Sequence, residues 1–131
     1  LLGITTPPRW GGAGYDTLSY ALVMEELCVG DASVADLCGL VELCATLLSE
    51  LGTDAQKKRY LAPLLQGQVT CSFALTEPDA GSDLAALAST AAKVADGYVL
   101  NGTNHFIHNG LKEPVGAFGA DTNNIVVEIL G

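Results

Sequence analysis

The sequence predicts an α+β fold, in which a helical segment precedes antiparallel β-strands that form part of a β-barrel. Up to Gly67, apolar residues recur at the i, i+3, i+4 spacing of helices. Beyond it come short β-branched and aromatic runs, separated by the dipeptides Asp96-Gly97 and Asn101-Gly102, which favour tight hairpin turns. We therefore expect a partial helical domain over residues 1–68 and a partial β domain over residues 69–131.

Length and charge exclude several classes of protein. A chain of 131 residues with 49% hydrophobic residues is long enough for one packed domain, or one and a half. Its net charge of −9, with only six Lys and Arg, argues against a nucleic-acid partner. The longest apolar stretch, residues 37–49, contains Glu42 and is shorter than a membrane span. We expect a protein without an integral membrane segment.

The four cysteines show no C-x-x-C pair and no histidine at ligand spacing, so neither a metal site nor a disulfide framework is expected. We expect small buried hydrophobes in a reducing compartment. The opening "LLGITTPPRW" lacks an initiator Met and is not a secretory signal, which suggests a cut chain that is not secreted. Three helices would leave apolar surface uncovered and about four strands cannot close a barrel, so both halves are expected to be partial.

The helical half begins with a turn-rich lead-in over residues 5–16, after which Asp16 caps a helix that runs to about Val29. Asp31 or Ser33 caps a second helix, which ends at Gly52. Leucines, valines and cysteines extend almost around this second helix. We therefore expect it to be buried between neighbours.

A third helix is predicted after Gly52, because Thr53 and Gln56 stand at capping-box spacing. Pro63 must kink or restart this helix, which then stops at Gly67. Strands are expected at residues 68–75, on both sides of Asp96-Gly97, after Asn101-Gly102, and at residues 123–130.

The stretch "FALTEPDAGSD", residues 73–83, breaks from an apolar run into a polar turn. A strand that ends at Leu75-Thr76 would present unpaired backbone groups and a hydroxyl. Pro78 fixes φ, and Gly81 would let the chain reverse and a ligand approach the backbone. Ser82 adds a hydroxyl and an N–H near a short helical turn. Such converging N–H groups bind anions without cationic side chains, so a planar heterocycle with a pyrophosphate tail would fit.

The acids of this stretch leave other interpretations to weigh. Glu77, Asp79 and Asp83 would repel a phosphate and are expected to point elsewhere. Their alternation suggests a calcium loop, but Gly81 occupies a ligand position and Ala88 stands where a bidentate Glu belongs, which excludes it. An ordinary capped turn between a strand and a hairpin remains the alternative.

Longer motifs resemble one family. "ALTEPDAGSDLAA", residues 74–86, resembles the first signature of the acyl-CoA dehydrogenase family of flavoproteins. "PPRWGGAGYD", "ELGTDAQKKRYLAPLLQGQ" and "DGYVLNGTNHFIHNG" are similar to further elements of that family, in the same order and spacing. The resemblance covers about residues 3–110.

The resemblance implies FAD between the middle β domain and a C-terminal helical domain. It implies α,β-dehydrogenation of an acyl-CoA thioester in fatty-acid β-oxidation, with electrons passing to an electron-transfer flavoprotein. It also implies a homo-oligomer, a tetramer or a dimer, in the bacterial cytoplasm or the mitochondrial matrix. Ser82 would contact the substrate as well as the cofactor. The implied cofactor-binding residues are Phe73, Leu75, Thr76, Gly81, Ser82, Phe106, Ile107 and His108.

Departures from the family pattern keep alternatives open. No catalytic residue is assigned, because the family's catalytic carboxylate comes from the C-terminal domain. The hairpin Lys of the family is Asn104, followed by His105, which strand alternation would point away from Phe106. His108 stands where the family has a hydroxyl that reaches flavin N5. Its imidazole would either donate a hydrogen bond to N5 or block the flavin face, or it is an ordinary surface histidine without a role in the site. Two alternative functions remain. The protein is a catalytically inactive family member or fragment that retains only the fold, or it is a related flavin oxidase or monooxygenase.

Overall fold

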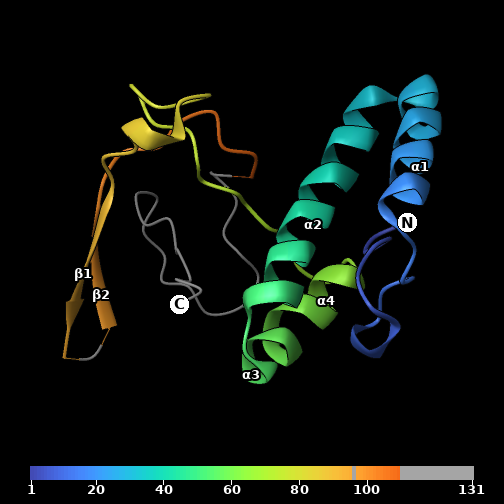
Figure 1. Ribbon diagram of the computed structural model, residues 1–131, viewed down its shortest axis with the longest axis horizontal. Coiled ribbons are helices and arrows are strands. Elements are labelled where there is room, and N and C mark those ends of the chain that lie inside the picture. The colour runs from blue at the N-terminus through green and yellow to red at the C-terminus, as the bar shows by residue number, and fades with distance from the viewer. Residues whose placement is uncertain (96, 110–131) are drawn as a thin grey trace.

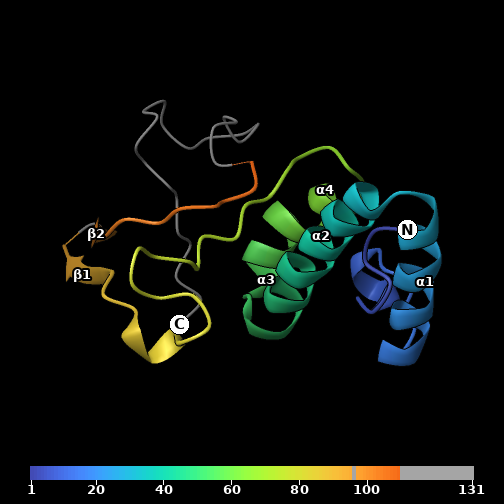
Figure 2. The ribbon, with the colours of Figure 1, turned by 90° about the horizontal axis from the view of Figure 1, so that it is seen from above.

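The computed structural model describes residues 1–95 and 97–109. It places a helical half and a β-hairpin at opposite ends, joined by an extended segment (Figure 1; Figure 2). The predicted order, helices first and antiparallel strands second, is confirmed. The elements are η1 (Pro8–Trp10), α1 (Thr17–Gly30), α2 (Ala32–Leu51), α3 (Asp54–Gln56), η2 (Lys57–Leu61), α4 (Ala62–Leu65), η3 (Leu84–Ala86), β1 (Thr90–Val94) and β2 (Gly97–Asn101).

The two long helices form a hairpin whose ends are set by aspartates. The Asp16 carboxylate accepts a hydrogen bond from Ser19 N at 2.8 Å and begins α1 as predicted. Asp31 ends α1 and also caps α2, accepting from Ser33 N at 2.8 Å and Val34 N at 3.2 Å. Of the two caps that the sequence allowed for α2, the structure uses Asp31.

The third helical stretch is interrupted at the predicted proline. The capping box is present, because Thr53 N donates to Gln56 Oε1 at 2.7 Å and Gln56 N donates to Thr53 Oγ1 at 3.3 Å. Pro63 has no N–H to donate, and the turn before it, η2, widens into a π-helix in which Ala62 N–H donates to Lys57 O. The stretch ends at Gly67, whose φ of +68° suits glycine.

The core of the helical half is a cluster of buried residues from α2, η2 and α4: Cys44, Ala45, Leu61 and Leu64. Half-buried residues pack around it, including some from the extended segment that follows α4: Trp10, Leu40, Val41, Leu48, Leu65, Val69, Cys71 and Phe73. Burial of this apolar surface attaches the start of the extended segment to the helices.

Buried Glu42 fixes the N-terminal segment against α2. Its carboxylate accepts from Ile4 N at 2.8 Å, from Thr5 N at 2.7 Å and from the Thr5 hydroxyl. A buried carboxylate is tolerated where several donors satisfy its oxygens. Glu42 therefore anchors the lead-in beside α1 and α2.

The expectation that α2 is buried all round is wrong for the described residues. One side of α2 packs on α1, η2 and α4, whereas apolar residues elsewhere on it are exposed by 43–59%: Val34, Leu37, Leu43 and Leu51.

The helix α2 is longer than the apolar stretch of residues 37–49, because it spans 20 residues. By length and composition alone α2 could cross a membrane, which is weak support for a span, since soluble core helices pass the same test.

The β half differs from prediction on both sides of its hairpin. β1 and β2 pair antiparallel, with Thr90 opposite Asn101 and Val94 opposite Gly97, so the hairpin around Asp96-Gly97 is confirmed. The strand predicted over residues 68–75 is wrong, since this segment forms no strand in the described structure. Strand-like composition makes a strand only where a ladder partner lies alongside.

The strand predicted after Asn101-Gly102 is also wrong, because residues 102–109 leave β2 without turning back on it. This segment instead meets the extended segment, where His105 N donates to Thr76 O at 3.0 Å. The strand predicted over residues 123–130 lies outside the described residues.

Candidate functional site

The chain reverses in a tight turn over Glu77–Ala80. Glu77 N donates to Ala80 O at 2.8 Å and Ala80 N donates to Glu77 O at 3.2 Å, with Pro78 and Asp79 exposed at the tip. The expectation that Gly81 makes the reversal is wrong. Gly81 has no positive φ, and a Cβ built there meets nothing within 4 Å. Its missing side chain leaves the backbone beside it open.

Buried Glu77 holds the far side of this loop. Its carboxylate accepts from Ala88 N at 2.8 Å and from Ser89 N at 3.0 Å. The Ser89 side chain, followed by these two amides, lowers the pKa of Glu77, because each donor favours the ionised carboxylate. This inward direction agrees with the expectation that the acid would point away from a bound phosphate.

The outer side of the loop offers amide donors. Gly81 and Ser82 are exposed, and no residue within 1–95 or 97–109 accepts a hydrogen bond from their N–H groups. Asp83 accepts from Ala85 N at 3.1 Å and so caps the 3₁₀ turn η3. Its carboxylate is thus engaged within the chain. Free amides beside a short turn are a suitable donor set for a pyrophosphate.

The Thr76 carbonyl joins this loop to the segment after β2. It accepts from His105 N at 3.0 Å and from Asn104 Nδ2 at 3.3 Å. A second asparagine, Asn109, donates from Nδ2 to Cys71 O at 2.9 Å. The protein itself therefore uses the Thr76 carbonyl, whereas no group in the described ranges accepts from the N–H of Thr76. The site suits a cofactor that accepts hydrogen bonds.

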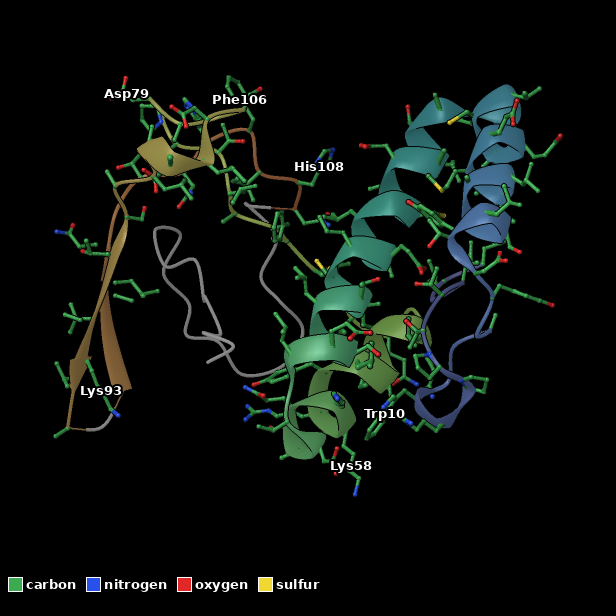
Figure 3. All side chains as sticks on the ribbon, viewed as in Figure 1. Trp10, Lys58, Asp79, Lys93, Phe106 and His108 are labelled. Atoms are coloured by element: carbon green, nitrogen blue, oxygen red, sulfur yellow. The ribbon has the colours of Figure 1, made fainter. Side chains whose placement is uncertain are left out.

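Phe106 lies at the surface near the turn. Its side chain is 86% exposed, and Figure 3 shows it at the same end of the β half as Asp79. The expectation that His105 points away from Phe106 is wrong, since their ring centroids are 4.5 Å apart at 34°. Phe106 has a φ of +59°, and this left-handed residue breaks the alternation of an extended strand.

His108 contacts the helical half. Its Nε2 lies 2.8 Å from Asp36 Oδ2 on α2, and Figure 3 shows the side chain at the edge of the β half that faces α2. The two side chains are 53% and 62% exposed. Asp36 is not among the predicted site residues, because an aspartate one turn into a helix carries no sequence signal of a distant partner.

The eight predicted cofactor residues do not gather in one place. The Thr76 carbonyl is bonded to the backbone N–H of the residue before Phe106, and two predicted residues, Gly81 and Ser82, lie on the outer loop. Phe73 packs instead against the helical core, and His108 reaches Asp36. Leu75 and Ile107 are half-buried.

Comparison with known proteins gives consistent matches along the chain. The family described as "Acyl-CoA dehydrogenase, N-terminal domain" matches residues 1–68, and "Acyl-CoA dehydrogenase, middle domain" matches residues 72–124. A short-chain specific acyl-CoA dehydrogenase of Clostridium acetobutylicum is 42% identical over 115 residues, which are 84% of this chain and 29% of that protein. The chain thus spans less than a third of that relative.

Two solved structures agree. A chain in the structure of the electron transferring flavoprotein of Acidaminococcus fermentans has a TM-score of 0.75 and 44% identity, covering 84% of this chain and 29% of that one. A glutaryl-CoA dehydrogenase of Mycobacterium smegmatis in complex with FADH2 has a TM-score of 0.77 and 33% identity, covering 83% and 28%. With the family matches over both halves, these likenesses show that the chain belongs to the acyl-CoA dehydrogenase family.

Proposed function

We propose that this chain is the part of an acyl-CoA dehydrogenase that begins its cofactor site, with a helical domain over residues 1–68 and a middle β domain over residues 69–131. The activity of the longer protein is α,β-dehydrogenation of an acyl-CoA thioester. The observation that carries this proposal is the loop after Thr76. Glu77 fixes its inner side, whereas Gly81 and Ser82 are exposed and their N–H groups have no acceptor within residues 1–95 or 97–109.

The cofactor is FAD, which supplies the acceptor for the hydride that leaves the β-carbon of the substrate. The amides of Gly81 and Ser82 would bind its pyrophosphate, and Leu75 and Thr76 would lie at the pyrimidine side of its ring. Phe106 and Ile107 would lie beside the ring, and the Ser82 hydroxyl would also reach the thioester arm. Ordered donors of this kind bind charge without a reorganisation cost at the moment of reaction.

The proposal includes an electron acceptor and an assembly. An electron-transfer flavoprotein would receive the electrons, which fits the likeness to a chain in the structure of such a protein from Acidaminococcus fermentans. A homo-oligomer, in the bacterial cytoplasm or the mitochondrial matrix, and a role in fatty-acid β-oxidation belong to the same proposal.

The test is made on the full-length protein that contains this chain. Purified protein should show the absorbance of bound flavin, and anaerobic addition of acyl-CoA esters of graded chain length should bleach it, with reoxidation by an electron-transfer flavoprotein. Protein that stays colourless after incubation with FAD would show the proposal to be wrong. Oxygen consumption with acyl-CoA and without the electron-transfer partner would indicate an oxidase or monooxygenase instead.

A second candidate is a family member that retains the fold and binds flavin without turnover. The favouring observation is His108, which stands where the family has a hydroxyl and whose Nε2 is bound to Asp36. In the same experiment this candidate predicts flavin absorbance that no acyl-CoA bleaches. Bleaching by any acyl-CoA ester would exclude it.

A further inference from the structure

The dipeptide Asn101-Gly102 does not form the tight turn that the sequence predicts. Asn101 is the last residue of β2, and the chain leaves the hairpin there without turning back on it. Gly102 has no positive φ, so no turn conformation requires a glycine at this position. A side chain would instead collide with Ser89, since a Cβ built on Gly102 lies 2.6 Å from Ser89 Cβ. Close packing on Ser89 therefore requires the glycine, and this leaves Asn101 directly before it.

Asn101 and Gly102 are both exposed to solvent at the end of the ladder. Figure 1 and Figure 2 show the hairpin of β1 and β2 standing apart from the helical half. The Asn101 carbonyl accepts from the Thr90 hydroxyl at 3.5 Å, whereas its side-chain amide has no hydrogen-bond partner within residues 1–95 and 97–109. The Gly102 N–H also donates to no acceptor in those ranges. The side-chain amide carbon of Asn101 and the nitrogen that can attack it are therefore both accessible.

The other asparagines of the same segment are held by hydrogen bonds. Asn109 also precedes a glycine in the sequence, but it is half-buried and its Nδ2 donates to Cys71 O at 2.9 Å. Asn104, which no glycine follows directly, donates from Nδ2 to Thr76 O at 3.3 Å. Any reaction that expels this side-chain nitrogen must first break such a bond. The structure thus distinguishes Asn101 from its two neighbours.

We propose that Asn101 is a site of spontaneous deamidation, through a cyclic imide formed with Gly102. The Gly102 backbone nitrogen attacks Cγ of Asn101, so that a C–N bond forms, the bond from Cγ to Nδ2 breaks and ammonia leaves with the Gly102 amide proton. Glycine favours this step because it has no side chain to hinder the approach. Water then opens the imide at either carbonyl and gives aspartate or isoaspartate. Water is the only co-reactant, and no atom changes its oxidation state.

Conversion of Asn101 would change both the charge and the backbone of this segment. Either product adds a negative charge to the end of β2, in a chain whose net charge is already −9. Isoaspartate also places the side-chain methylene in the main chain, which lengthens the backbone between β2 and His105. Because His105 N bonds to Thr76 O at 3.0 Å, the longer backbone would shift residues 102–109 against the loop after Thr76.

In the experiment the full-length protein is incubated in mildly alkaline buffer, with a parallel sample unfolded in urea. Both samples are digested with pepsin at acid pH, where the imide forms slowly, and mass spectrometry follows the exchange of amide for carboxyl at each asparagine. In the native sample we expect Asn101 to convert about 5-fold faster than Asn109, the factor that one broken hydrogen bond contributes. In urea the two should convert at similar rates, because both precede glycine.

Two variants at the same position provide the controls. Asn101→Gln should show no conversion there, because its longer side chain closes a ring far more slowly. Asn101→Asp is the chromatographic standard for one product, and we expect a second product, isoaspartate, that elutes apart from it. The proposal is overturned if native Asn101 stays intact while the urea sample converts, if native Asn109 converts as fast as Asn101, or if aspartate is the sole product. The mass measurement does not depend on FAD, so failure of the proposed function would leave it unchanged.

Discussion

Asp36 Oδ2 and His108 Nε2 lie 2.8 Å apart and join α2 to the segment that follows β2, although the Asp36 side chain is 62% exposed and that of His108 is 53% exposed. Asn109 adds a second contact between that segment and the extended chain by donating to Cys71 O at 2.9 Å. The Asp36–His108 contact thus connects the two halves of the described structure, whereas the Asn109 contact joins two segments of the β half. Because the Asp36–His108 contact is exposed, solvent screening limits its contribution to the free energy of unfolding.

The Asp36–His108 contact is expected to couple by less than about 1 kcal/mol, because exposed ion pairs gain little over hydration. Asp36→Ala, His108→Ala and the double variant form the double-mutant cycle, measured by urea unfolding of the full-length protein. A coupling free energy above about 2 kcal/mol would contradict this exposed geometry.

Glu42→Ala is expected to lower the free energy of unfolding by about 2–4 kcal/mol, since it leaves the amides of Ile4 and Thr5 without their acceptor in a largely buried place. Glu42→Gln should cost less, because one carbonyl oxygen still accepts. Glu50→Ala on the exposed side of α2 is the control and should change stability by less than about 0.5 kcal/mol. Equal effects of Glu42→Ala and Glu50→Ala would show that the anchor is absent.

Glu77 should make stability depend on pH in the acid range. Its pKa is lowered from the ordinary value of 4.5 by the Ser89 side chain and the amides of Ala88 and Ser89. A lowered pKa in the folded state means that the stabilisation is complete above 4.5 and is lost as the pH falls from there through the folded-state value.

Glu77→Gln is therefore expected to destabilise the protein at neutral pH and to flatten the pH dependence below that value. Thermal unfolding between neutral and acid pH measures both effects, and Glu50→Gln serves as a carboxylate control without such donors in the described structure. If the difference between native protein and Glu77→Gln stayed constant with acidification, the assigned role of Glu77 would be wrong.

Gly12→Ala is expected to cost about 1–3 kcal/mol, because its Cβ would lie 2.1 Å from the carbonyl oxygen of Thr6 and the backbone must move. Gly30→Ala is the matched control at the end of α1, where a Cβ meets nothing within 4 Å. There we expect a gain of up to about 1 kcal/mol, since alanine favours the helix. Chemical unfolding compares the two, and equal values would contradict the close approach at Gly12.

Thr76→Val removes only the side-chain hydroxyl from the proposed cofactor site. Asn104 and His105 donate to the backbone carbonyl of Thr76, which the valine variant keeps. Loss of one hydrogen bond to FAD should raise its dissociation constant by about 5–10-fold. Thr70→Val, at an exposed position of the same extended segment, should leave the constant unchanged. Fluorescence titration of the apoprotein with FAD measures both dissociation constants. If Thr76→Val binds FAD as tightly as the native protein, the Thr76 hydroxyl does not contact the cofactor.

The sequence by itself determined the local elements of this protein. Asp16, Thr53 with Gln56, and Pro63 mark the helix ends and the interruption because capping and proline effects act within a few residues. The hairpin of β1 and β2 follows for the same reason from Asp96-Gly97. The family also was evident from sequence, since its motifs are contiguous runs.

Only the tertiary structure decided which distant groups meet. Residues 68–75 have strand composition but no ladder, because pairing depends on a partner elsewhere in the chain. The positive φ of Phe106 brings its ring to His105, and no periodic pattern could signal that. The contacts of His108 with Asp36 and of Cys71 with the carbonyl of Leu40 join residues far apart in the sequence. Their chemistry depends on a separation in space that the order of residues does not encode locally.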